Sequence, residues 1–104
     1  MVPVLAVGEA AFLIERCLGV RAEALFVADL AGSDISVADV PPSEWVRIGE
    51  LVATYADLNL GTVDASVVAA AERLGITAVA TTDRRHFSVI RPLHTPAFEL
   101  PLLD

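Results

Sequence analysis

Helical segments that end at glycines alternate with short apolar runs in this chain, and the alternation constrains the fold more than any other feature. Three helices are predicted, over residues 4–18, 21–31 and 62–74. Three short strands are predicted, over residues 35–37, 76–81 and 87–91. Such alternation is typical of a parallel sheet with helices on its faces. With 104 residues, the chain is expected to form one α/β domain over residues 1–104.

A fourth helix is expected to begin near Pro41, because proline is tolerated in the first turn of a helix. Its apolar residues recur at helical spacing and predict a core-facing stripe of Trp45, Ile48, Val52 and Tyr55. In the helix over residues 62–74, the same reasoning selects Val63, Val67, Ala70 and Leu74. Prolines in the tail leave room for one short edge strand near Phe98.

Composition limits the class of protein. Hydrophobic residues make up 55% of the sequence, yet no apolar run approaches the roughly 18 residues that a membrane span needs. The one cysteine, Cys17, excludes an internal disulfide and is consistent with a reducing cytoplasm. The formal net charge of −7 opposes indiscriminate binding to nucleic acid.

The positive charge is distributed unevenly. All seven basic residues are arginines, and Arg84, Arg85 and Arg91 lie in one short stretch. Arginine presents a fork of N–H donors that matches phosphate oxygens. A solvated loop is the alternative, and charge by itself favours that alternative.

Glu9 is the one charged residue among the first fourteen. It follows Leu5 by four positions and precedes Phe12 by three, so it is expected to share a helical face with apolar side chains. A carboxylate on a buried face is costly unless it is paired or bound to a metal. The alternative to a functional role is a structural ion pair, with Arg16 as the partner.

Two aspartates occupy positions where a site can form. Asp64 is expected in the first turn of its helix, where the unsatisfied N–H groups and the helix dipole would by themselves account for a carboxylate. Asp83 follows an expected strand, and sites in parallel sheets form at the carboxyl ends of strands. Thr81 points to the same side of that strand and can hydrogen-bond to Asp83. A turn aspartate is the alternative for Asp83.

The other candidate residues limit which metal ion and which reaction the chain could support. Asp57 is expected in a surface loop with at most an accessory role, and His86 and His94 lack the spacing of a zinc site. Carboxylates without cysteine or paired histidine favour Mg²⁺ or Mn²⁺ over zinc. Such ions hold phosphates and activate water, so these acids, if they converge, indicate phosphodiester hydrolysis.

The stretch from Tyr55 to Pro92 resembles the C-terminal half of PIN-domain ribonucleases and, more narrowly, of the VapC toxins of bacterial type II toxin–antitoxin systems. The matching residues are Tyr55, Asp57, Val63-Asp64-Ala65-Ser66, Arg73-Leu74-Gly75, Thr81, Asp83, Arg84-Arg85 and Phe87. The stretch from Gly8 to Gly19 resembles the family's second conserved helix and its glutamate. The resemblance covers nearly the whole chain.

This resemblance implies a metal-dependent endoribonuclease with a PIN-like parallel sheet flanked by helices. The implied catalytic and Mg²⁺-binding (or Mn²⁺-binding) carboxylates are Glu9, Asp64 and Asp83, supported by Thr81 and Asp57, with Arg84 and Arg85 at the RNA phosphates. It also implies an RNA substrate, often tRNA or ribosomal RNA, and a cognate antitoxin that occupies the site. A homodimer, a cytoplasmic location and no membrane association complete the expectation.

Members of the family open with a strand that carries the first catalytic aspartate and lies at the centre of the sheet, and no counterpart precedes Glu9. The chain is therefore expected to lack this strand, with impaired activity and poor stability or solubility; either the start is placed too late or the chain is a remnant. Three interpretations stay open. They are a ribonuclease toxin, an inactive PIN remnant that binds an antitoxin or a toxin chain, and an unrelated α/β domain with scattered acids.

Overall fold

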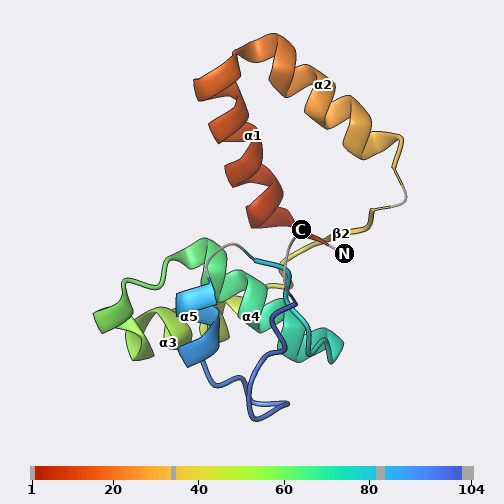
Figure 1. Ribbon diagram of the computed structural model, residues 1–104. Coiled ribbons are helices and arrows are strands. Elements are labelled where there is room, and N and C mark those ends of the chain that lie inside the picture. Colours follow the sequence, from red (N-terminus) through yellow and green to blue (C-terminus); the bar gives the residue numbers. More distant parts are fainter. Residues whose placement is uncertain (1, 34, 82–83, 102–104) are drawn as a thin grey trace. The chain divides into compact units, whose positions relative to one another are not determined.

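A computed structural model of the protein describes residues 2–33, 35–81 and 84–101. The chain divides into two compact units, Met1–Val40 and Pro41–Asp104. Figure 1 shows the helices of both units coloured along the sequence. The boundary falls at Pro41, directly before the segment in which the sequence predicts the start of a helix.

The N-terminal unit is a helical hairpin with a short pair of strands (Figure 1). Its helices are α1 (Val4–Leu18) and α2 (Val20–Ala31). Gly19 joins them with φ of 90°, a backbone conformation that residues with a Cβ rarely adopt. The two helices predicted for this part of the chain are therefore confirmed, and α2 begins one residue earlier than predicted.

The strand pair of this unit is parallel. β1 (Val2–Pro3) pairs with β2 (Val37–Ala38), with Val2 opposite Val37 and Pro3 opposite Ala38. The Val2 amide also donates to the Ser36 carbonyl at 2.8 Å. The strand predicted over residues 35–37 is therefore present but lies later in the chain than predicted.

Glu9 lies on an exposed side of α1, so the buried apolar face predicted around it is wrong. No residue of α1 or α2 is buried, and the neighbouring Phe12 is 55% exposed. The physical reason is that α1 packs against one helix within its unit, which leaves much of its circumference open. Within the described residues, neither Glu9 nor Arg16 forms an ion pair.

The C-terminal unit is mostly helical (Figure 1). Its elements are α3 (Glu44–Thr54), the 3-10 turn η1 (Ala56–Leu58), α4 (Thr62–Leu74) and α5 (Arg84–Val89). α4 has the predicted bounds and ends at Gly75, whose φ of 68° lies in the left-handed region. α3 packs against α4.

The faces that α3 and α4 bury agree only in part with those predicted. The buried residues of α4 are mostly small: Ala65, Ser66, Val68, Ala69, Ala70 and Ala71. Ala70 is the one member of the predicted stripe among them, and Leu74 is 37% exposed. On α3, Ile48 and Leu51 are buried, whereas Trp45 is 48% exposed. Small side chains allow two helices to approach closely, so the alanine-rich side faces inward here.

The strands predicted in the second half of the chain are largely replaced by other structure. Within residues 76–81, Ala78 forms an isolated parallel bridge with Glu99, next to the position predicted for an edge strand. The Val79 amide donates to the Glu99 carbonyl at 2.9 Å. The strand predicted over residues 87–91 is wrong, because this segment begins inside α5.

The C-terminal tail completes the core of its unit. Phe98 is buried and meets the ring of Phe87 edge to face, with centroids 6.2 Å apart. The predicted α/β class is confirmed, with a small parallel sheet and helices. Among the helices of the described residues, none combines the length and the hydropathy that crossing a bilayer requires.

Candidate functional site

Helix α4 positions Asp64 in its first turn. Gly61 precedes the helix in extended conformation and provides no side-chain cap, so the first N–H groups are left to other acceptors. A carboxylate in this turn is stabilised by those N–H groups and by the helix dipole. Asp64 is half-buried, and the next residues, Ala65 and Ser66, are buried and small. The side of the helix next to Asp64 is therefore built of side chains that occupy little space.

The other predicted site residues are distributed over both units. Thr81 is half-buried and lies in the C-terminal unit with Asp64, whereas Glu9 is exposed on α1 of the N-terminal unit. Asp57 is exposed in η1, as predicted for a surface residue. Asp83 lies outside the described residues. The acidic site formed by Glu9, Asp64 and Asp83 therefore stays a prediction.

Metal-binding capacity can be examined within the described residues alone. Across residues 2–33, 35–81 and 84–101, no three His, Cys, Asp or Glu side chains gather in a way that could hold a metal ion. Asp64 is a carboxylate donor of the type that Mg²⁺ and Mn²⁺ prefer. Glu9 belongs to the other unit and Asp83 lies outside the described residues, so a complete acidic ligand set stays a prediction.

The two arginines at the start of α5 have different surroundings. The Arg84 Nη1 donates to the carbonyl oxygens of Leu100 at 2.6 Å and Pro101 at 3.2 Å. Arg85 is exposed, and its guanidinium makes no hydrogen bond or ion pair with any described residue. Their neighbour in sequence, Arg91, donates from Nη1 to the Ser88 carbonyl at 2.8 Å.

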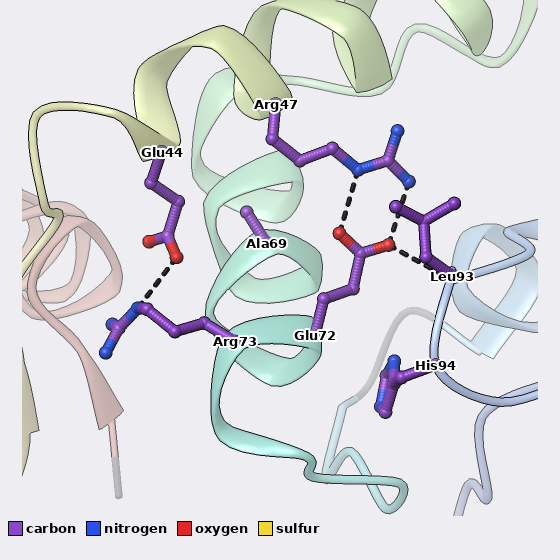
Figure 2. A pocket seen from close by; sticks show the side chains of 7 residues that line it. All are labelled: Glu44, Arg47, Ala69, Glu72, Arg73, Leu93 and His94. Carbon is purple, nitrogen blue, oxygen red and sulfur yellow. Dashed lines mark hydrogen bonds and ion pairs between the residues drawn. The ribbon is translucent and has the colours of Figure 1, made fainter.

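A polar cluster that the sequence did not predict lies towards the other end of α4 (Figure 2). It lines a hollow of about 390 Å³ formed by Glu44, Arg47, Ala69, Glu72, Arg73, Leu93 and His94. Arg47 donates to Glu72 through two parallel hydrogen bonds of 2.8 Å, from Nε and Nη2. The Arg73 Nε donates to Glu44 Oε1 at 2.8 Å. The partners are 25 and 29 residues apart, so no local pattern in the sequence signals them.

Glu72 is the centre of this cluster. Its Oε2 also accepts the Leu93 amide at 2.8 Å, so one carboxylate holds α3, α4 and the tail together. Burial opposes ionisation of Glu72, but the hydrogen bonds from Arg47 and Leu93, with the charges of Arg47 and His94, hold its pKa below its ordinary value of 4.5. The hydrogen bond to Glu72 raises the pKa of Arg47.

The contacts of the cluster serve to hold α3, α4 and the tail together. Each arginine faces a glutamate, and the His94 Nε2 donates to the Ile76 carbonyl at 2.6 Å. Two buried atoms, Glu44 Oε2 and His94 Nδ1, find no hydrogen-bond partner in the described part of the chain. Both guanidinium groups of the cluster are engaged by glutamates, so neither arginine could bind a substrate without breaking an ion pair.

Comparison with known proteins identifies the family. A family model described as the PIN domain matches residues 1–91. The chain is 34% identical over 87 residues to Ribonuclease VapC26 of Mycobacterium tuberculosis, and the match covers 84% of this chain. It spans 64% of the length of that relative. An unrelated α/β domain with scattered acids is thereby excluded, and the chain belongs to the PIN-domain family.

Proposed function

We propose that this protein is the ribonuclease toxin of a type II toxin–antitoxin module and that it cleaves RNA phosphodiester bonds. The observation that carries the proposal is the PIN-domain match, which runs through both units from residue 1 to residue 91. The similarity to a protein named as a ribonuclease supports the same reaction class. The match through both units also supports treating residues 1–104 as one domain.

The proposed catalytic residues are the carboxylates of Glu9, Asp64 and Asp83. Asp64 is half-buried, and the small side chains of Ala65 and Ser66 beside it would let another group approach its carboxylate closely. A bound Mg²⁺ or Mn²⁺ would supply Lewis-acid stabilisation of the phosphate and activation of water. Thr81 and Asp57 are assigned supporting roles.

Arginine supplies the proposed contact with RNA. The proposed contact is Arg84 or Arg85, which begin α5 directly after Asp83 in sequence, because a guanidinium fork matches phosphate oxygens. The formal charge of −7 makes such local cations necessary, because the chain as a whole repels a polyanion. tRNA and ribosomal RNA are the proposed substrates.

The remaining parts of the proposal follow from the toxin assignment. A cognate antitoxin would occupy the acidic site, the toxin would form a homodimer, and both would act in the cytoplasm. An inactive PIN protein that binds an antitoxin or another toxin chain is the competing function, and the experiment below separates the two.

Cleavage of a labelled bulk tRNA sample, with and without Mg²⁺, tests the proposal. Asp64→Asn and Asp83→Asn should each lower the Mg²⁺-dependent rate by at least about 100-fold, the upper range for loss of a residue that only supports a metal ligand. Asp29→Asn, on the exposed surface of α2, is the matched control and should cleave normally. Undiminished cleavage by Asp64→Asn would remove Asp64 from the site, and antitoxin binding without cleavage by the unsubstituted protein would favour the competing function.

A further inference from the structure

The five arginines of the C-terminal unit differ in how many of their donors are already used. Arg47 and Arg73 face the carboxylates of Glu72 and Glu44. Arg84 and Arg91 donate to backbone carbonyls. Arg85 is the one arginine of this unit whose guanidinium has no hydrogen-bond or ion-pair partner among the described residues.

The geometry of α5 explains the difference between the two adjacent arginines. Phe87 is buried and defines the inner side of the helix, and Ile90, directly after the helix, is buried too. Arg84 precedes Phe87 by three positions and so lies on the same side, where the tail passes. Arg85 precedes Ser88 by three positions and Val89 by four, and both of these residues are exposed.

The surroundings of Arg84 suit a fastening role. Its Nη1 donates to the carbonyls of Leu100 and Pro101. The two residues before them also contact the rest of the unit: Phe98 packs on Phe87, and Glu99 forms the bridge with Ala78. Turning this guanidinium towards a ligand would leave two carbonyls without their donor. Arg85 can turn without breaking any contact with a described residue.

We infer that Arg85 is the residue of this unit that binds an RNA phosphate, whereas Arg84 is a positioning residue that holds the C-terminal tail against α5 by hydrogen bonds. The inference rests on the proposed ribonuclease function and deepens it by separating two arginines that the sequence presents as equivalent. The charge of Arg84 still adds to the attraction of RNA at long range, but its fork serves the protein's own backbone.

The test is equilibrium binding of a fluorescein-labelled 12-nucleotide single-stranded RNA, with EDTA present to prevent cleavage, over a series of salt concentrations. Arg85→Gln should reduce the slope of log affinity against log salt by about 0.7, the value for one phosphate contact on a single strand. Its melting temperature should be unchanged, because no described contact is lost.

Arg84→Gln should give the opposite pattern. Loss of the donor to two carbonyls should lower the melting temperature by about 4 °C, and the salt slope should stay close to that of the unsubstituted protein. Arg84→Lys, which keeps a charged donor, should recover part of the lost thermal stability. Arg91→Gln is the matched control and should leave the salt slope unchanged.

An unchanged salt slope in Arg85→Gln would overturn the inference, as would a reduced slope with an unchanged melting temperature in Arg84→Gln. If the unsubstituted protein cleaves tRNA and Arg85→Gln binds RNA normally, the inference alone fails. If the unsubstituted protein neither binds nor cleaves RNA, the proposed function fails, and the proposed phosphate contact of Arg85 fails with it. The melting temperature of Arg84→Gln still decides whether Arg84 holds the tail against α5.

Discussion

Replacing Glu72 by glutamine tests how much the polar cluster contributes to stability. The substitution keeps the size of the side chain but removes the charge that faces the forked guanidinium of Arg47. It also weakens the acceptor of the Leu93 amide. The Arg47 charge would keep only its contact with Glu50, at 3.3 Å.

The expected loss lies between two limits. Exposed ion pairs contribute about 0–1 kcal/mol, whereas removing one partner of a fully buried pair costs about 3–5 kcal/mol. The side chain of Glu72 is 10% exposed and that of Arg47 23% exposed, so the pair lies between the two limits. Because partial exposure lets water reach Arg47, we expect the free energy of unfolding to fall by about 2 kcal/mol.

Urea denaturation at pH 7, followed by circular dichroism, measures this loss. Glu50→Gln is the matched control: its side chain is 59% exposed, and it should cost less than about 0.5 kcal/mol. Equal losses in the two variants would refute the reasoning, because they would mean that burial does not distinguish the two ion pairs.

The Glu72→Gln variant also tests how the contribution of Glu72 to the free energy of unfolding depends on pH. The pKa of Glu72 is lowered in the folded protein, so its contribution is fully present above the ordinary value of 4.5 and is lost as the pH falls through the folded value. The difference in unfolding free energy between the unsubstituted protein and Glu72→Gln should therefore be constant near neutral pH. It should shrink as the pH falls below 4.5. A difference that stays constant down to strongly acidic pH would contradict the assigned pKa direction.

Two further predictions concern the backbone and the core. Gly75→Ala should destabilise the protein by about 1 kcal/mol, because φ of 68° is strained for a residue with a Cβ. Gly49→Ala, in open space within α3, should stabilise it by roughly 0.5–1 kcal/mol. If urea denaturation showed Gly75→Ala to be stabilising and Gly49→Ala to be destabilising, the helix assignments would be contradicted. Phe87→Ala should cost about 3 kcal/mol, since Phe87 is 2% exposed and packs on Phe98. A loss below about 1 kcal/mol would place Phe87 outside the core.

Helix limits were predictable from the sequence, because glycine has a local physical effect. Gly19 and Gly75 both adopt positive φ, and the helices before them end where predicted. The direction in which a helix faces was harder to predict. Apolar strength selected Val63 and Leu74 for the core, but α4 turns its small residues towards α3.

The error in α5 has a similar origin. The segment from Phe87 to Arg91 contains β-branched residues and is short, which makes strand and helix difficult to distinguish. The buried pair is Phe87 and Ile90, three positions apart, whereas period-two alternation would have buried Val89, which is 46% exposed. The spacing of the two largest apolar side chains, Phe87 and Ile90, was therefore a better guide than β-propensity.

Some features of the candidate site follow from local sequence, and others depend on contacts between distant segments. Local position was enough to predict that Asp64 lies in the first turn of α4, whereas its role in a site stays a prediction. The surroundings of Arg84 and Arg85 depend on where the tail returns, 16 and 17 residues after Arg84. The cluster around Glu72 depends on packing between distant segments. Neither arrangement is encoded in a local pattern.

In the proposed function, Glu9, Asp64 and Asp83 would together hold one divalent ion. Titration of the ¹⁵N-labelled protein with substoichiometric Mn²⁺, followed by NMR, tests it most directly, because Mn²⁺ broadens the amide signals close to it. We predict simultaneous broadening at Glu9, Asp64 and Thr81, competition by Mg²⁺, and loss of the effect in Asp64→Asn. Broadening confined to one unit, or unaffected by Asp64→Asn, would contradict the claim.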